Sequence, residues 1–194
     1  MHVDHNPKVP KRQTALLGEG EDPGPALAAM ARGLQDAGAD FLVMPCNTAH
    51  AFADAVRGAV SIPLISIIDV TVDACRDKGA VGVLATDGCL QTNIYQDALQ
   101  KAEIDCVLPN ADETTELMRL ISAIKAGNRS ETVASGMRNI GNALVGRGAR
   151  AIIAGCTEFP LVLTDDLLDV PLVSSTDVLA ELTAAIAAGK HPID

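Results

Sequence analysis

Short runs of mainly apolar residues recur along the chain, and none of them alternates regularly between apolar and polar residues. They cover residues 39–44, 62–68, 80–85, 104–108, 149–154 and 170–174. Runs of this kind are typical of parallel strands that helices cover on both faces. The intervening stretches have apolar residues three or four positions apart, as in Leu27, Met30 and Leu34, which would share one helix face. This alternation predicts an α/β fold with parallel sheets flanked by helices.

Two segments of the chain share one layout. FLVMPCNTAHAF (41–52) and AIIAGCTEFPLV (151–162) each run from an apolar strand through a cysteine and a threonine into a helical segment. The repetition predicts two similar lobes, with the active site in the cleft between them. We assign residues 1–77 and 175–194 to the first lobe and residues 78–174 to the second. Each lobe would present a thiol at the carboxyl end of a strand, where open α/β sheets bind ligands.

Charge and cysteine content exclude several classes of function. The chain has 25 Asp and Glu against 15 Lys and Arg, a net charge of −10, so nucleic acid and anionic membrane are poor partners. No apolar run approaches the roughly 20 residues that span a bilayer, and the N-terminus lacks the apolar core of a signal peptide. We therefore expect a soluble cytoplasmic protein. The five cysteines are widely spaced and form no CxxC pair, which predicts neither a disulfide framework nor a metal site.

Paired thiols suit a particular chemistry. Inverting a carbon that bears a hydrogen needs a base on one face and an acid on the other, and Cys46 and Cys156 could supply both. Asn47, Thr48 and Thr157 follow the thiols and could donate hydrogen bonds to a substrate. A helix N-terminus at such a place favours a carboxylate and lowers the pKa of a nearby thiol from about 8.5. Neither motif contains a lysine, so no pyridoxal Schiff base is predicted.

The remaining cysteines and one histidine have more ordinary interpretations. Cysteine is among the most buried residue types, and we interpret Cys75 and Cys106 as packing residues. Cys89 follows a strand, and for it two interpretations stay open: packing, or lining the cleft. We interpret His50 as structural.

The motifs carry a family resemblance. The segments are HNPKVPKRQTALLGEGEDPGP (5–25), GADFLVMPCNTAHAF (38–52), GVLATDGC (82–89), AIKAGN (123–128) and GARAIIAGCTEFPLV (148–162). In these segments the chain resembles the cofactor-independent aspartate/glutamate racemase superfamily, and closely its aspartate racemase branch. The similarity extends from about residue 3 to about residue 182. It implies a PLP-independent isomerase that interconverts L- and D-aspartate, without a cofactor and as a homodimer.

The resemblance also implies roles for individual residues. Cys46 and Cys156 would be the two acid/base thiols, and Asn47, Thr48 and Thr157 would hydrogen-bond the substrate.

Three charged residues complete the implied site. Arg12 matches the arginine that recognises a substrate carboxylate, a task that suits a bidentate guanidinium. Lys125 matches a lysine near the side-chain carboxylate, and Glu158 would orient or tune the second thiol. The implied substrate is a small dicarboxylic amino acid.

Two features depart from the family pattern. The family places a threonine where Cys89 stands, and a thiol is a weaker hydrogen-bond donor. Family members also begin with a strand, a GGMGP-type loop and a helix, which this sequence lacks. We therefore expect a first lobe that is incomplete at its N-terminus, through a truncated or misassigned start.

Other activities on the same scaffold stay open. They are glutamate or broad-range amino-acid racemisation, hydantoin racemisation and maleate isomerisation. A non-catalytic dicarboxylate-binding protein is the alternative from a different class.

Overall fold

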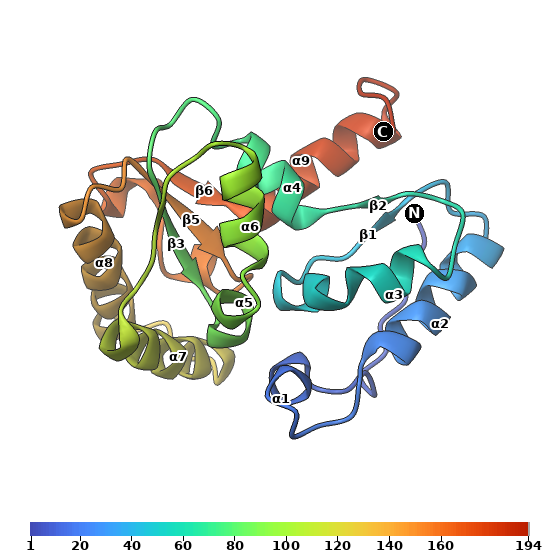
Figure 1. Cartoon of the computed structure of the whole chain (residues 1–194), viewed down its shortest axis with the longest axis horizontal. Coiled ribbons are helices and arrows are strands. Elements are labelled where there is room, and N and C mark those ends of the chain that lie inside the picture. Colours follow the sequence, from blue (N-terminus) through green and yellow to red (C-terminus); the bar gives the residue numbers. More distant parts are fainter. Residues whose placement is uncertain (194) are drawn as a thin grey trace.

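The computed structural model describes residues 1–193 and has the predicted α/β fold, with parallel strands in two sheets (Figure 1). Residue 194, the last of the predicted first lobe, lies outside the described residues. Among the described residues, no helix is both long and apolar enough to cross a membrane.

The larger sheet has the strand order β4-β3-β5-β6. Every neighbouring pair in it is parallel, with Val83 opposite Ile153 at the centre. All residues of the two central strands are buried, as the non-alternating apolar runs predicted. The strands are β3 (Val81–Ala85), β4 (Cys106–Val107), β5 (Ala151–Gly155) and β6 (Leu172–Ser174).

The smaller sheet pairs β1 (Leu42–Val43) with β2 (Leu64–Ile65) in parallel. Both strands are shorter than the predicted runs 39–44 and 62–68. The second run ends early because Ser66 caps a helix there: its hydroxyl oxygen accepts a hydrogen bond from the Asp69 N–H at 3.2 Å.

Helices fill the segments between the strands. Residues 91–102 lie between two predicted strand runs but do not form one helix, because Asn93 has a φ of 55° in the left-handed region and interrupts the helix. The short helix α1 was not predicted. The α-helices are α1 (Arg12–Leu16), α2 (Gly24–Asp36), α3 (Ala53–Arg57), α4 (Ile67–Asp73), α5 (Asp87–Gln91), α6 (Ile94–Lys101), α7 (Ala111–Lys125), α8 (Glu131–Gly146) and α9 (Ser175–Ala187), with 3-10 turns η1 (Thr48–Phe52), η2 (Phe159–Leu161) and η3 (Asp165–Leu167).

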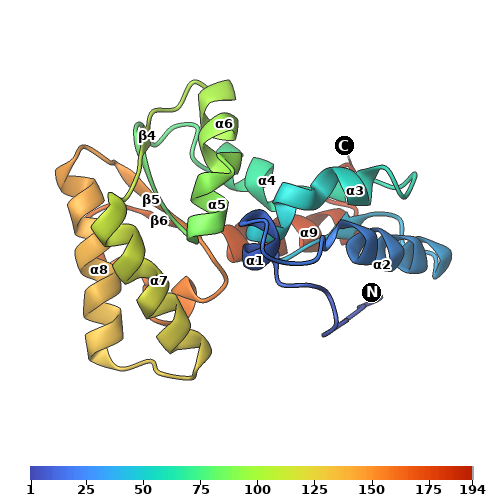
Figure 2. The same ribbon diagram turned by 60° about the horizontal axis from the view of Figure 1, so that its bottom comes forward.

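The two faces of the larger sheet contribute to different hydrophobic clusters. Leu84 and Ile152 pack with α7 and α8, which lie side by side in Figures 1 and 2. Val83 and Ile153 point to the opposite face and pack with α4, α6 and α9. Alternate strand residues therefore enter opposite halves of the core.

The N-terminal part of the chain has a much smaller core. Its cluster contains Ala31, Leu42 and Val56 as fully buried apolar residues, where α2 and α3 pack against each other beside the two-stranded sheet (Figure 1). Helix α4 packs instead against α6 and α9. The boundary between the lobes at residue 77 stays a prediction.

Candidate active site

The two candidate thiols each follow a parallel strand. Cys46 lies in the loop between β1 and η1, is partly exposed, and donates its backbone N–H to the Met44 carbonyl at 2.8 Å. Cys156 directly follows β5 and is 8% exposed. Both therefore occupy the sheet edge at which ligands bind in open α/β folds.

Contacts near Cys89 join the segment that follows Cys46 to the end of β3. The hydroxyl groups of Thr48, in η1, and Thr86, at the end of β3, form a hydrogen bond of 2.9 Å. The Thr86 hydroxyl also accepts the N–H of Cys89 at 3.3 Å. Burial raises the pKa of the Cys89 thiol, and the charges of Cys156 and Cys46 raise it further. Cys89 is thus buried beside the hydrogen bond between Thr48 and Thr86.

Cys156 is held as a protonated thiol by its surroundings. Its Sγ–H donates to Glu158 Oε2 at 2.8 Å. Burial raises the pKa of Cys156 to about 12, and the hydrogen bond and negative charge of Glu158 act in the same direction. The sequence-based expectation of a lowered pKa is therefore wrong for this thiol. The following 3-10 turn η2 has only three residues, so its dipole is too small to offset desolvation and a carboxylate.

Glu158 also contacts two of the predicted substrate-binding residues. Thr157, which is exposed, donates its hydroxyl to Glu158 Oε2 at 3.2 Å. Lys125, at the end of α7, places its Nζ 3.9 Å from Glu158 Oε1, with 56% of its side chain exposed. The structure therefore brings these two residues to the Cys156 side of the site, while their contacts with substrate stay predictions.

Arg12 begins α1 and is partly buried. Its guanidinium donates to the Pro10 carbonyl at 3.0 Å. The helix that carries it packs against η1 and α5, and Gln13 donates to Asp87 Oδ1 at 2.6 Å. Arg12 thus approaches the site through α1, and its carboxylate recognition stays a prediction.

The side chain of Asn47 points into the protein interior. It is 3% exposed, accepts the Tyr95 hydroxyl at 2.6 Å and donates to Ser175 Oγ at 3.1 Å. The substrate contact of Asn47 stays a prediction. Sequence analysis missed Tyr95 and Ser175. The sequence offered one indication for Ser175: it begins a helix directly after a strand, and both thiols also lie between a strand and a helical turn.

His50 joins the Cys46 loop to α4. Its Nε2 accepts the N–H of Ile67 at 3.2 Å, so Nδ1 carries the proton and donates to the Cys46 carbonyl at 3.0 Å. Burial lowers the pKa of His50 and keeps the ring neutral. This arrangement agrees with a structural histidine.

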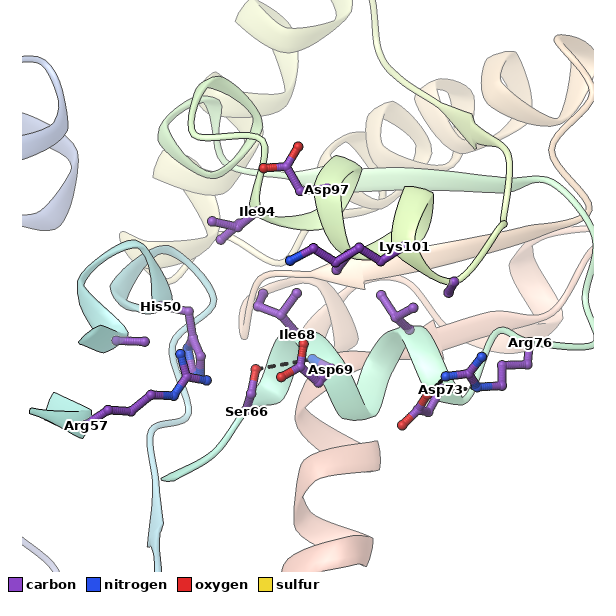
Figure 3. Close-up of a pocket in the computed structure, with 14 residues that line it drawn as sticks. His50, Arg57, Ser66, Ile68, Asp69, Asp73, Arg76, Ile94, Asp97 and Lys101 are labelled. Carbon is purple, nitrogen blue, oxygen red and sulfur yellow. Dashed lines mark hydrogen bonds and ion pairs between the residues drawn. The ribbon is translucent and has the colours of Figure 1, made fainter. Parts of the chain in front are cut away.

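A groove of about 530 Å³ lies beside His50, between α3, α4 and α6 (Figure 3). Arg57 stands next to the histidine, Lys101 extends from α6, and Asp69 lies on α4 opposite it. The described lining contains none of the predicted site residues. Across the part of the chain that the structure describes, no group of three His, Cys, Asp or Glu side chains is arranged to hold a metal ion.

Comparisons with known proteins agree on one family. The model of the Asp/Glu/Hydantoin racemase family matches residues 1–183. A broad-specificity amino-acid racemase of Bacillus subtilis is 30% identical over 154 residues, covering 78% of this chain and 66% of the relative. A glutamate racemase of Deinococcus radiodurans is 32% identical over 129 residues, covering 64% of this chain and 44% of the relative.

The fold comparison gives a shared architecture. The solved structure of Picrophilus torridus aspartate racemase superposes with a TM-score of 0.83 at 24% identity, covering 96% of this chain and 78% of that one. The chain spans less than two thirds of the length of the two curated relatives. The family model covers nearly all of the sequence, and the chain belongs to the Asp/Glu/Hydantoin racemase family.

Proposed function

We propose that this protein interconverts L- and D-aspartate by transferring the α-proton between two thiols, without a cofactor. The observation that carries the proposal is that Cys46 and Cys156 each follow a parallel strand, in segments that Ser175 joins through hydrogen bonds to Asn47 and to the Ala154 carbonyl. Family membership supports racemase chemistry, and the fold shared with an aspartate racemase is compatible with that substrate.

In the proposed reaction, the Cys46 thiolate removes the α-proton from one face of the substrate. Cys156, which holds its proton in a hydrogen bond to Glu158, donates that proton to the opposite face. Cys46 then ends as the thiol and Cys156 as the thiolate, so the reverse reaction exchanges the two roles. Glu158 tunes Cys156 by favouring its protonated form.

The proposed substrate is a small dicarboxylic amino acid. Arg12 would bind one carboxylate and Lys125 the other, since both carry cationic groups. In support, the helix of Arg12 packs against η1, and Lys125 lies beside Glu158. Thr48, Thr157 and the backbone N–H of Asn47, whose side chain is directed into the interior, would supply hydrogen bonds as negative charge develops on the substrate.

The proposal extends to the cellular setting. We propose that the protein is a cytoplasmic homodimer and that it binds neither nucleic acid nor membrane. The net charge of −10 supports the second part, because it repels these anionic partners.

The names of the relatives suggest alternative substrates for this protein. One curated relative is a broad-specificity amino-acid racemase and another is a glutamate racemase, while the family description includes hydantoin racemases. Maleate isomerisation and aspartate binding without turnover are the further alternatives.

Proton NMR in deuterium oxide tests the proposal. L-aspartate and D-aspartate are incubated separately with the reduced protein, without pyridoxal phosphate. The wild type should lose the α-proton signal and produce the opposite enantiomer, and Cys46→Ser and Cys156→Ser should each abolish inversion. Cys106→Ser, in β4, is the matched control and should remain active.

The substrate panel separates the alternatives. Glutamate, alanine, a hydantoin and maleate are tested in parallel. Turnover of alanine or glutamate at least as fast as aspartate would defeat the aspartate assignment. Binding of aspartate without exchange of its α-proton would favour the non-catalytic alternative.

A further inference from the structure

A buried chain of hydrogen bonds connects the two segments that carry the candidate thiols. The Tyr95 hydroxyl donates to Asn47 Oδ1 at 2.6 Å, and Asn47 Nδ2 donates to Ser175 Oγ at 3.1 Å. Ser175 in turn donates to the backbone carbonyl of Ala154 at 2.9 Å. Asn47 is the residue next to Cys46, and Ala154 lies two residues before Cys156.

Tyr95 also contacts the Cys156 segment directly. A Cβ placed on Gly155 would lie 3.0 Å from the ring carbon Cε2 of Tyr95, so the aromatic ring packs closely against the residue before Cys156. Tyr95 therefore touches both thiol segments, with its hydroxyl on Asn47 and its ring on Gly155.

Every member of this chain lies in the interior. Tyr95 and Ser175 are fully buried and Asn47 is nearly so. Burial raises the pKa of the Tyr95 hydroxyl, which therefore keeps the proton that it donates. Because removing one partner leaves a buried polar group unpaired, the chain of bonds favours a single arrangement of the two segments.

We propose that Tyr95 and Ser175 are positioning residues that hold the Cys46 loop at a set distance from Cys156. The inference rests on the proposed two-thiol function. Transfer of a proton to and from opposite faces of one carbon requires both sulfur atoms in place at once. Tyr95, Asn47 and Ser175 belong to three different elements, so they tie α6, the β1–η1 loop and α9 to the end of β5.

The test uses variants that remove one hydroxyl each. Tyr95→Phe keeps the ring against Gly155 and removes the bond to Asn47, while Ser175→Ala removes the link to Ala154. Thr183→Val is the matched control, because Thr183 also lies on α9 and donates its hydroxyl to a backbone carbonyl, that of Leu179 at 2.6 Å. Circular dichroism and urea denaturation establish that each variant is folded.

Kinetics give the first readout. In Tyr95→Phe and Ser175→Ala, kcat for aspartate should fall about 10- to 100-fold while KM changes little, as a misplaced catalytic group predicts. The deuterium isotope effect on the α-proton should rise or stay maximal, because proton transfer limits the rate. Thr183→Val should keep the wild-type kcat. A wild-type kcat in folded Tyr95→Phe and Ser175→Ala would overturn the proposal.

Cross-linking gives a second readout that does not depend on activity. Dibromobimane joins two thiols only when both lie within its short reach, and peptide mapping identifies the Cys46–Cys156 product. Its yield should fall in Tyr95→Phe and Ser175→Ala but not in Thr183→Val, and equal yields in all folded variants would overturn the positioning role. If the wild type exchanges no α-proton, the proposed function fails, and the cross-link still decides whether these residues position the thiols.

Discussion

Replacing Glu158 by glutamine should make Cys156 ionise more easily. The Cys156 Sγ–H donates to Glu158 Oε2 at 2.8 Å, and this carboxylate favours the protonated thiol in two ways. It accepts the thiol proton, and its negative charge repels a thiolate. Glutamine removes the charge and leaves an amide of nearly the same shape, so the substitution tests electrostatics with little change in packing.

The size of the effect follows from the strength of a charged hydrogen bond. Such bonds contribute about 1.5–3 kcal/mol, and about 1.4 kcal/mol corresponds to a tenfold change. With a pKa of about 12, roughly one Cys156 in ten thousand is ionised at about pH 8. Glu158→Gln should raise that fraction about 10- to 100-fold. The pKa of Cys156 should stay above that of a free thiol, because burial remains the largest cause of the shift.

The assay measures the ionisation of one thiol. Iodoacetamide reacts with thiolates, and mass spectrometry of the Cys156 peptide gives its alkylation rate as a function of pH. Ultraviolet absorbance of the thiolate, compared with Glu158→Gln/Cys156→Ser, separates ionisation from reagent access. Glu181→Gln, on the exposed side of α9, is the control and should leave Cys156 unchanged. If alkylation and absorbance of Cys156 are the same in Glu158→Gln as in the wild type, the carboxylate does not hold the thiol proton.

Two further predictions concern stability, each measured by urea denaturation. His50→Gln should lower the free energy of unfolding by about 1–3 kcal/mol, because the Cys46 carbonyl and the Ile67 N–H lose their shared partner. Burial lowers the pKa of His50 in the folded protein below its usual value of 6.5. The wild type should therefore lose stability as the pH falls below about 6.5, because the unfolded chain then binds a proton that the folded ring does not. His50→Gln should lack this contribution, and equal acid sensitivity of the two proteins would contradict the prediction. Gly155→Ala should destabilise by about 1–3 kcal/mol, since its Cβ would lie 3.0 Å from both the Leu84 carbonyl and the Tyr95 ring. Gly33→Ala, with nothing within 4 Å, should stabilise α2 by about 0.4–1 kcal/mol, and equal losses at the two glycines would refute the packing argument.

The strands were predictable because a strand that is buried on both faces has apolar residues at successive positions. Strands β3 and β5 are buried along their whole length, and neither strand contains a polar side chain. The repeated Cys-containing segments likewise indicated where both thiols lie, since a strand end followed by a helix start is a local feature of the chain.

The helices were predicted less accurately, because local capping and backbone conformation decide where they begin and end. Ser66 starts α4 within an apolar run that resembles a continuing strand. Asn93 divides a segment whose apolar spacing suits one helix. In both places a single side chain or dihedral angle outweighs the periodicity.

The sequence by itself determined the α/β class, the family and the position of each thiol at a strand end. Only the tertiary structure decided how these thiols are surrounded, because their burial and the contacts of the residues beside them depend on parts of the chain that are distant in sequence. Asn47 meets Ser175 across 128 positions, a contact that no local pattern encodes. The elevated pKa of Cys156 depends on desolvation by the folded core and on where the Glu158 carboxylate lies. Burial and hydrogen bonding exist only once the core has formed, and they set the chemistry of a thiol whose position the sequence already indicates.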